Sequence, residues 1–599
     1  MMNSRKIIPF LLLFALTACS DARKKEDAPK QNTAVQQVHQ ETDVPLDTVT
    51  DEGDTVEASK TASVPKPSVI KAFPEEEARE IKEKFSGRMD DADDGIQMLS
   101  MAKAPSESLS GSMRSGANIA IPPPAPEWNR ESYNAVTENG FISTTNDPLS
   151  TFSIDVDTAS YSNVRRFINE GRLPPKGAVR IEELINYFSY TYSQPEDEHP
   201  FSLTTELGPC PWNDSRKLVR IGLKAKNIDK KELPPSNLVF LIDVSGSMSA
   251  PNKLPLLQKS MKMLVRQLGE KDRISLVVYA GNDRVVLPPT PGSEQRKIIA
   301  AIDALGAGGS THASSGILTA YELAEQALPA KGNNRIILAS DGDFNVGITS
   351  RDELQKLVEE KRKTGVYLTV LGFGMGNYHD DTMEVLADKG NGNYAYIDNL
   401  LEAKKVMVKE MSGTLFALAS DVKIQVEFNP AKVGAYRLIG YENRALADED
   451  FNDDTKDAGE IGVGHTVTAL YELIPAGAAG QPTVDPLKYQ KSEQSAEAQY
   501  TDELMTVKLR YKPLRASESV LFDTVVKEND LALEKTSNDF RFAAAVAGFG
   551  MLLSDSEHAD GVTWPRVLTL AKGAKGEDKE GYRAEFIRLI ETAEILAGK

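Results

Sequence analysis

Between residues 237 and 417, short apolar segments alternate with amphipathic segments of helical period. The apolar segments include "NLVFLID", "RISLVVYA", "RIILASDG" and "VYLTVLGFG", and between them lie stretches such as "KLPLLQKSMKMLVRQL" and "SEQRKIIAAIDAL". Strands that are apolar along their whole length are buried on both faces, and their alternation with helices is typical of a mostly parallel sheet. The pattern therefore predicts a doubly wound α/β domain over residues 237–418, with any ligand beyond the carboxyl ends of its strands.

Strand patterns occur on both sides of this α/β segment. "FSLTTELGPC" and "RKLVRIGLKA" precede it, and "DVKIQVEFN", "HTVTALYELI" and "LMTVKLRYK" follow it. We therefore expect one β-sandwich into which the α/β domain is inserted, followed by helices from about Asn538 to the end of the chain. In this division residues 127–236 form the N-terminal flanking region, and residues 419–599 form a C-terminal β-rich and helical domain.

A helical pattern in the N-terminal flanking region follows "SIDVDTAS". Asp157 and Ser160 carry the side-chain oxygens that cap helices, so we expect them to cap a helix that starts near Tyr161.

The first 126 residues divide into a signal peptide and a tether. In residues 1–18, Arg5 and Lys6 precede an apolar stretch of about ten residues, which is typical of a signal peptide and too short to span a bilayer. The sequence "LTAC" resembles the lipobox of bacterial lipoproteins, which implies that Cys19 is lipidated, and Ser20 after it implies the outer membrane. Residues 19–126 are rich in Glu, Lys, Asp, Pro, Ser and Thr, which predicts a disordered tether.

Composition excludes some classes of protein. The formal net charge is −19, whereas nucleic-acid-binding domains carry a basic face, so we expect no nucleic-acid partner. Cys19 and Cys210 are the only cysteines, which excludes a disulfide framework and leaves Cys210 as a lone structural thiol. The longest apolar run, residues 543–553, is too short to span a membrane and predicts a buried helix.

Candidate ligands for a metal ion follow three of the predicted α/β elements. Asp243, Ser245 and Ser247 occur in "FLIDVSGSMS" at the end of the first apolar strand, where Gly246 is expected to let the backbone curl. Thr311 lies in the glycine-rich loop "GAGGSTHASSG", and Asp341 directly follows the strand "RIILAS". Because the carboxyl ends of parallel strands meet at one edge of a sheet, these side chains are expected to lie together. A solvated serine turn that caps the next helix is the structural alternative for "DVSGSMS" alone.

This set resembles the metal-ion-dependent adhesion site of the von Willebrand factor type A (VWA) domain. In that family the serines and the threonine ligate the ion directly and the aspartates act partly through water, which implies the same roles here. The flanking segments "DPLSTFSIDVDTASYSNVRRF", "VRIEELINYF" and residues 441–473 resemble those of bacterial YfbK-type VWA lipoproteins. Together the resemblances cover nearly all of residues 130–599.

The ligand types indicate both the ion and its use. All candidate ligands are hard oxygens, which favours Mg²⁺, with Mn²⁺ or Ca²⁺ as alternatives. Two carboxylates barely neutralise a doubly charged ion. The ion is therefore expected to keep coordination positions for water, and a partner's carboxylate can occupy one of them. We therefore predict a non-enzymatic, lipid-anchored cell-envelope protein, on the outer membrane facing the periplasm, that captures an acidic residue of a protein partner. Two alternatives stay open: a metal-dependent hydrolase using the same aspartates, although no general base is evident, and a scaffold with a vestigial site.

Other polar motifs fit known sites poorly. Asp155 with Asp157, and Asp341 with Asp343, lack the Thr or Val that phosphohydrolases of the haloacid dehalogenase type need two residues further on. The acidic segment 448–460 lacks the Gly and Glu of an EF-hand loop, so we expect a solvated loop. His312, beside Thr311, is expected to be an exposed loop residue.

Overall fold

The structure is a computed structural model, and it describes most of the chain beyond the tether. It describes residues 131–598 except 155–156, 230, 281–282, 309–315, 328–331, 343–350, 377, 411–412, 414–415, 457, 483–500, 515 and 530. The predicted signal peptide, Cys19 and the tether therefore lie outside the described residues, as do Asp155, Thr311, His312 and Asp343.

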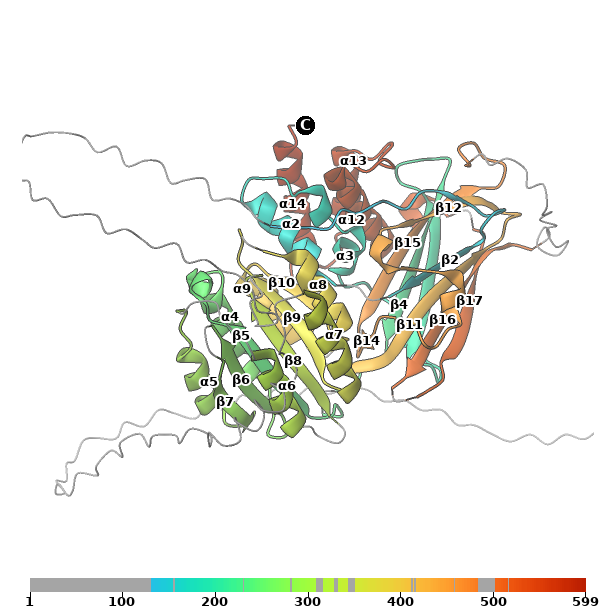
Figure 1. Ribbon diagram of the computed structural model, residues 1–599. Coiled ribbons are helices and arrows are strands. Elements are labelled where there is room, and N and C mark those ends of the chain that lie inside the picture. The colour runs from blue at the N-terminus through green and yellow to red at the C-terminus, as the bar shows by residue number, and fades with distance from the viewer. Residues whose placement is uncertain are drawn as a thin grey trace, which may run out of the picture. The chain divides into compact units, whose positions relative to one another are not determined.

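The α/β segment forms a sheet whose described strands run in the order β10-β9-β8-β5-β6-β7 (Figure 1). All neighbouring strands are parallel except β6 and β7, which are antiparallel. The bounds are β5 Ser236–Asp243, β6 Arg273–Tyr279, β7 Arg284–Pro291, β8 Asn333–Ser340, β9 Tyr367–Phe373 and β10 Tyr394–Ile397. The chain leaves β5 toward β6 on one side and later returns to β8 on the other. The carboxyl ends of β5 and β8 therefore flank the position where the strand order reverses, which is where such sheets bind ligands.

Helices cover both faces of this sheet, as the apolar strand patterns predict. Leu238, Phe240 and Ile242 of β5 pack with the helices of one face, and the alternate residues Val239 and Leu241 pack with those of the other. The first face carries α4 Leu254–Val265, α5 Gln295–Asp303 and α9 Leu400–Lys404, and the second carries α6 Gly316–Gln326, α7 Arg351–Lys361 and α8 Asp380–Lys389. The predicted doubly wound, mostly parallel sheet is thus confirmed.

The flanking strands form the predicted sandwich, and each of its sheets mixes strands from before and after the α/β domain. One sheet has the order β1-β12-β15-β4-β3 and the other β13-β2-β11-β16-β17, with β14 paired to β11. Residues of both sheets share one hydrophobic core. The bounds are β1 Ile142–Ser143, β2 Leu149–Ser153, β3 Phe201–Pro209, β4 Lys217–Ala225, β11 Ala417–Phe428, β12 Val433–Ile439, β13 Ala445–Leu446, β14 Ile461–Gly462, β15 Thr466–Pro475, β16 Glu503–Pro513 and β17 Val520–Lys527. The α/β domain is therefore an insertion into one sandwich.

A helical cluster joins the N-terminal flanking region to the end of the chain. Helices α2 Ala159–Asn169 and α3 Ile181–Asn186 share a hydrophobic core with α12 Asn538–Ser554, α13 Trp564–Gly573 and α14 Tyr582–Leu596. Nearly all residues of α12 are buried, which confirms that the apolar run at 543–553 is a core helix. No helix among the described residues is long and apolar enough to cross a membrane.

The predicted cap of α2 is wrong. The helix begins at Ala159, two residues before the expected start near Tyr161, and no side chain caps it from Thr158. The Glu183 carboxylate of α3 instead accepts the backbone N–H of Ser160 at 2.8 Å, and Asp157 Oδ1 accepts the backbone N–H of Tyr394 at 2.7 Å. Tertiary partners have replaced the local cap, because both carboxylates are buried beside other elements.

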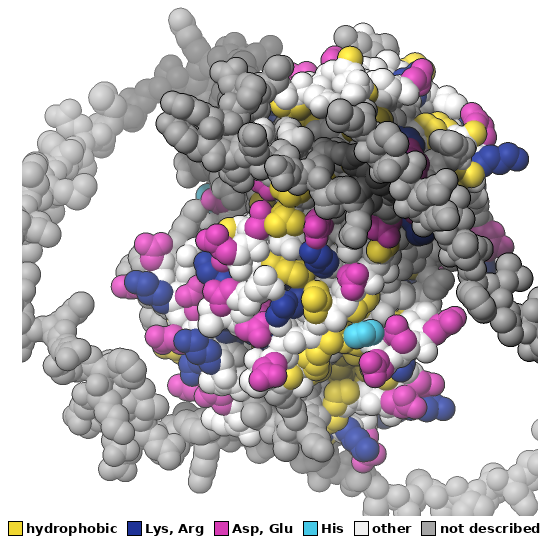
Figure 2. Space-filling view, turned by 90° about the vertical axis from the view of Figure 1, so that its right-hand side faces the viewer, with side chains coloured by type: hydrophobic (Ala, Val, Ile, Leu, Met, Phe, Trp, Pro, Cys, Tyr) yellow, Lys and Arg dark blue, Asp and Glu magenta, His cyan; other side chains and the backbone are white. Residues whose placement is uncertain are grey.

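The surface of the sandwich side is mixed in charge. On the face that carries β17, acidic and basic side chains are interspersed and some apolar side chains gather beside a histidine (Figure 2). The described residues of this face form no continuous basic patch of the kind that nucleic-acid-binding proteins use.

Candidate metal centre

The structure brings the ends of β5 and β8 together at one edge of the α/β sheet. The two strands are parallel neighbours with Ile242 opposite Ala339, so Asp243 ends β5 close to where Asp341 follows β8. Both aspartates are buried, with exposed fractions of 0% and 2%. Ser340 connects the two strand ends, since its hydroxyl donates to Asp243 Oδ2 at 3.3 Å and accepts the Gly342 backbone N–H at 3.1 Å.

The loop after β5 folds its two serines over the strand end. The backbone N–H of Ser245 donates to Asp243 Oδ1 at 2.8 Å, and the Oγ atoms of Ser245 and Ser247 lie 2.8 Å apart. The buried side chain of Met248 anchors the short 3₁₀-helix Gly246–Ser249, while Ser247 stays exposed. Three of the predicted ligand residues therefore share one turn, with one hydroxyl toward solvent.

Gly246 is not needed for this turn in the way the sequence suggested. It has no positive φ, and a Cβ atom added to it would meet nothing within 4 Å. The 3₁₀-helix, rather than unusual backbone freedom, produces the curl.

Burial and charge repulsion destabilise the ionised form of Asp243. Burial, together with the nearby Asp341 carboxylate, raises the pKa of Asp243 to about 6, although hydrogen bonds from Ser245 and Ser340 act in the opposite direction. The edge of the sheet thus concentrates negative charge in a place with little access to water.

Asp341 has one satisfied and one unsatisfied oxygen. Lys253 Nζ donates to Asp341 Oδ2 at 2.7 Å, whereas the buried Oδ1 has no hydrogen-bond partner among the residues that the structure describes. Gly374 leaves room for the Lys253 side chain, since its φ is +79° and an added Cβ there would lie 2.2 Å from the lysine Cε. Buried carboxylate oxygens are normally hydrogen-bonded or bound to a cation. Oδ1 therefore lacks the partner that such an oxygen usually has.

These residues fit a hard divalent cation. Asp243, Ser245, Ser247 and Asp341 supply carboxylate and hydroxyl oxygens, the donors that Mg²⁺ and Ca²⁺ prefer. Among the described residues, no group of three or more His, Cys, Asp or Glu side chains could hold a metal, so a cation at this edge would depend on hydroxyl and water oxygens as well. The fifth predicted ligand, Thr311, lies outside the described residues.

Two residues of this edge were missed by the reading of the sequence. Ser340 is the last residue of β8 and Lys253 precedes α4. Their signal was positional: Ser340 adjoins a predicted ligand, and Lys253 is a cation at the start of the predicted helical segment "KLPLLQKSMKMLVRQL". Neither position indicates on its own that the side chain turns toward the aspartates.

The remaining predicted features lie elsewhere. Cys210 is a free, buried thiol whose Sγ lies 3.7 Å from Glu472 Oε1, and burial raises its pKa well above the usual range. In the acidic segment, Asp448 accepts a hydrogen bond from the Thr151 hydroxyl at 2.7 Å, and Lys423 Nζ donates to the Asp453 carbonyl at 2.7 Å. These contacts give that segment a structural role at the edge of the sandwich.

Comparisons with known families cover nearly the whole described chain. The family of the von Willebrand factor type A domain matches residues 237–409, and the family "Uncharacterized protein YfbK, C-terminal" matches residues 413–596. A von Willebrand factor family also matches residues 127–220. "Uncharacterized protein YfbK" of Escherichia coli (strain K12) is 45% identical over 469 residues, which are 77% of this chain and 81% of that protein.

The chain belongs to the YfbK family. A more distant relative, "Inter-alpha-trypsin inhibitor heavy chain H4" of Sus scrofa, is 34% identical over 148 residues, which are 23% of this chain and 16% of that protein. A solved structure, "von Willebrand factor type A from Catenulispora acidiphila", has a TM-score of 0.35 at 16% identity and covers 65% of this chain and 90% of its own. Because the VWA family matches residues 237–409, the protein is a VWA-domain protein, and VWA domains commonly bind a divalent metal and mediate metal-dependent protein–protein interactions.

Proposed function

We propose that this YfbK-family protein is a lipid-anchored protein of the cell envelope whose VWA domain binds a divalent cation and captures a carboxylate of a protein partner. The observation that carries the proposal is the buried, unpartnered Oδ1 of Asp341, which lies at the same sheet edge as Asp243 and the hydroxyls of Ser245 and Ser247. A divalent cation bound there would satisfy this oxygen and offset the charge of both aspartates.

The charge balance supports capture of an acidic group. Asp243 and Asp341 supply at most two negative charges, and Lys253 already offsets part of them. A bound Mg²⁺, Mn²⁺ or Ca²⁺ would then keep a net attraction for an anion and positions held by water. Ser247 is exposed, so the cation would be reachable from outside. A partner's Asp or Glu side chain supplies the hard, charged oxygen that completes such a coordination sphere.

The anchor rests on the sequence "LTAC" at residues 16–19. Lipidation of Cys19, a tether over residues 19–126 and the folded part beyond it would place the cation site away from the membrane surface, facing the periplasm from the outer membrane. A flexible tether of this length has a root-mean-square span of about 60 Å.

Capture is tested by a pull-down from detergent-solubilised envelope extract, with the chain immobilised and Mg²⁺ present. We expect bound protein to be released by EDTA, to return with Mg²⁺, and to be missing with Asp243→Ala. Capture that survives both EDTA and Asp243→Ala would contradict the proposal. Turnover of a phosphoester panel that is lost in Asp243→Ala would favour a metal-dependent hydrolase instead.

Anchoring is tested separately by metabolic labelling with radioactive palmitate. We expect label in the wild-type chain and its loss in Cys19→Ser, together with release from the membrane fraction. Equal labelling of the two chains would refute lipidation at Cys19 and leave the cation site unaffected.

A further inference from the structure

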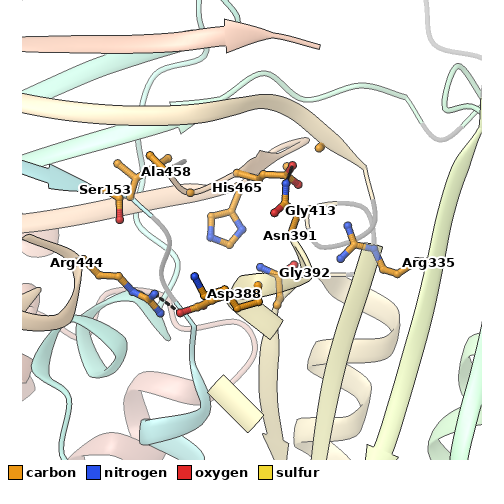
Figure 3. A pocket seen from close by; sticks show the side chains of 16 residues that line it. Ser153, Arg335, Asp388, Asn391, Gly392, Gly413, Arg444, Ala458 and His465 are labelled. Atoms are coloured by element: carbon orange, nitrogen blue, oxygen red, sulfur yellow. Dashed lines mark hydrogen bonds and ion pairs between the residues drawn. The ribbon is translucent and has the colours of Figure 1, made fainter. Parts of the chain in front are cut away.

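A polar cavity lies at the opposite end of the α/β sheet from Asp341, where that sheet meets the sandwich (Figure 3). Its volume is about 230 Å³. Arg335, Asp388 and Asn391 line it from the α/β domain, and Arg444 and His465 line it from the sandwich side. Arg335 is the third residue of β8, so a rise of about 3.3 Å per residue separates it from Asp341 by roughly 20 Å.

Arg335 is a buried cation with very few partners. Its exposed fraction is 2%, yet it makes a single hydrogen bond, from Nη1 to the Thr369 hydroxyl at 2.7 Å, and its guanidinium lies 5.6 Å from the centre of the Tyr367 ring. Its Nε is buried without a hydrogen-bond partner, and no carboxylate of the described residues lies within 4.0 Å of its nitrogens. Burial lowers the pKa of Arg335, with partial compensation from the charge of Glu460. A buried charge without an ion-pair partner is strongly unfavourable, so an anion bound beside this guanidinium would stabilise it.

The other cationic side chains of the cavity lining have ionic partners. Arg444 Nη1 donates to Asp388 Oδ2 at 2.6 Å, and its Nη2 lies 3.4 Å from Glu384 Oε1. Lys389, which is exposed at the rim, pairs with Glu359 at 2.9 Å.

The remaining polar groups of the lining are neutral or already bonded. Burial lowers the pKa of His465, which leaves its ring neutral at pH 7. Asn391 Nδ2 donates to Glu460 Oε1 at 3.1 Å. Glu460, whose charge acts on Arg335, also lines the cavity, but Arg335 is the cation of the described lining without a carboxylate within 4.0 Å.

We infer that this cavity binds a small-molecule carboxylate, with the Arg335 guanidinium as its anchor. The planar guanidinium fork matches the two oxygens of a carboxylate. Figure 3 shows the side chains of Arg335, His465 and Arg444 directed toward the cavity from different elements, so a bound anion would meet Arg335 on one side and the imidazole on another. A volume of about 230 Å³ is below that of pockets for drug-sized ligands, which restricts the ligand to the size of a short mono- or dicarboxylic acid.

The inference is tested by thermal unfolding of the full chain in EDTA with increasing sodium acetate or sodium succinate, against sodium chloride at equal ionic strength. We expect a saturable rise of Tm with a carboxylate and none with chloride, because a ligand that binds only the folded state stabilises it. Arg335→Met should abolish this rise, and its own Tm without ligand should equal or exceed that of the wild type, because an uncompensated buried charge has been removed. Lys389→Met, which removes a charge from the rim of the same cavity, should respond like the wild type.

Several results would overturn the inference. These are an absence of a saturable rise with both carboxylates in the wild type, an equal rise in Arg335→Met, or stronger stabilisation by inorganic phosphate than by either carboxylate. If Arg335→Met does not fold, Arg335→Lys is tested in its place. This variant keeps the positive charge and loses the planar, two-pronged guanidinium group. Titration calorimetry with succinate should then give affinity about tenfold weaker than the wild type, and unchanged affinity would contradict a role for the guanidinium as anchor.

Discussion

Two regions of this protein bury charged side chains in opposite ways. At the junction of the helical cluster and the α/β domain, Arg165 has three carboxylates within 4.0 Å, those of Asp398, Glu402 and Glu585, and Arg180 likewise has Glu183, Asp380 and Glu384. At the edge formed by β5 and β8, two buried aspartates lie close together, but the ammonium of Lys253 pairs with Asp341 alone, and Asp341 Oδ1 has no hydrogen-bond partner among the described residues. At the junction, each of these carboxylates has a guanidinium within 4.0 Å, and the ion pairs of Arg165 join the helical cluster to the α/β domain. At the sheet edge, Asp243 has no cationic partner among the described residues, and a metal ion would supply one.

The largest effect is expected from breaking the junction. Arg165→Met leaves the buried carboxylate of Glu402 without its cation, and loss of one partner of a buried ion pair costs about 3–5 kcal/mol. We expect a marked fall in Tm by differential scanning calorimetry. The matched control is Arg172→Met, which removes a half-exposed arginine paired with Glu170 and should change the free energy of unfolding by less than about 1 kcal/mol. Equal effects of the two variants would show that the junction does not stabilise the fold.

A smaller effect is expected at the sheet edge. Ser247→Ala removes an exposed hydroxyl that is a predicted ligand, so we expect Mg²⁺ affinity by titration calorimetry to fall about tenfold, with Tm in EDTA unchanged. Ser249→Ala, an exposed serine of the same 3₁₀-helix, should bind Mg²⁺ as the wild type does. A similar loss in both variants would mean that the helix, rather than the ligand hydroxyl, determines affinity.

Removing the ammonium should strengthen metal binding. Lys253→Met frees Asp341 Oδ2 from its 2.7 Å contact, so a cation no longer competes with the lysine, and we expect Mg²⁺ to bind about fivefold tighter, a change of roughly 1 kcal/mol. Lys259→Met, on the exposed side of α4, tests whether a general change in charge produces the same gain. Weaker binding in Lys253→Met would show that the lysine positions Asp341 instead of competing for it.

The last effect concerns the neighbouring carboxylates of Glu442 and Glu182. Burial, with added repulsion from Glu182, raises the pKa of Glu442 from 4.5 to about 7. The folded protein therefore holds a proton that the unfolded chain has released, and the free energy of unfolding should fall as pH rises from about 4.5 to about 7 and then level off. Glu442→Gln should flatten this fall, measured as Tm against pH in EDTA, because the amide does not titrate. An unchanged pH profile in Glu442→Gln would contradict the assignment to this pair.

The sequence predicted the architecture well where patterns are regular. The apolar strands and amphipathic helices of residues 237–417 require a sheet covered on both faces, and the alternating segments on either side require a sandwich. Strand β7 was missed because "RVVLPPTP" contains prolines, which edge strands tolerate and internal strands exclude. The cap of α2 was wrong because Glu183, distant in sequence, supplies the acceptor that local reading assigned to Asp157 and Ser160.

For the metal site, the sequence predicted only those residues whose place at the end of a strand brings them together. Asp243 ends β5 and Asp341 follows β8, and these parallel strands are neighbours. Such a pair of strand ends is expected where the strand order of a doubly wound sheet reverses. Lys253 and Ser340 were not predicted, because whether a side chain turns toward the aspartates depends on packing such as that of Lys253 against Gly374. Arg335 was missed for the same reason: nothing in "NNRIILAS" reveals that its guanidinium is buried without a carboxylate.

The central claim is that the charge deficit at Asp243 and Asp341 is a binding site for a divalent cation. Titration calorimetry of Mg²⁺ into the metal-free full chain, with Asp243→Ala as its partner experiment, tests it most directly. We expect saturable binding at one site in the wild type and no measurable binding in Asp243→Ala, whose Tm in EDTA should equal or exceed that of the wild type because a buried carboxylate of raised pKa has been removed. Failure of the wild-type chain to bind Mg²⁺, Mn²⁺ or Ca²⁺, or equal binding by folded Asp243→Ala, would contradict it.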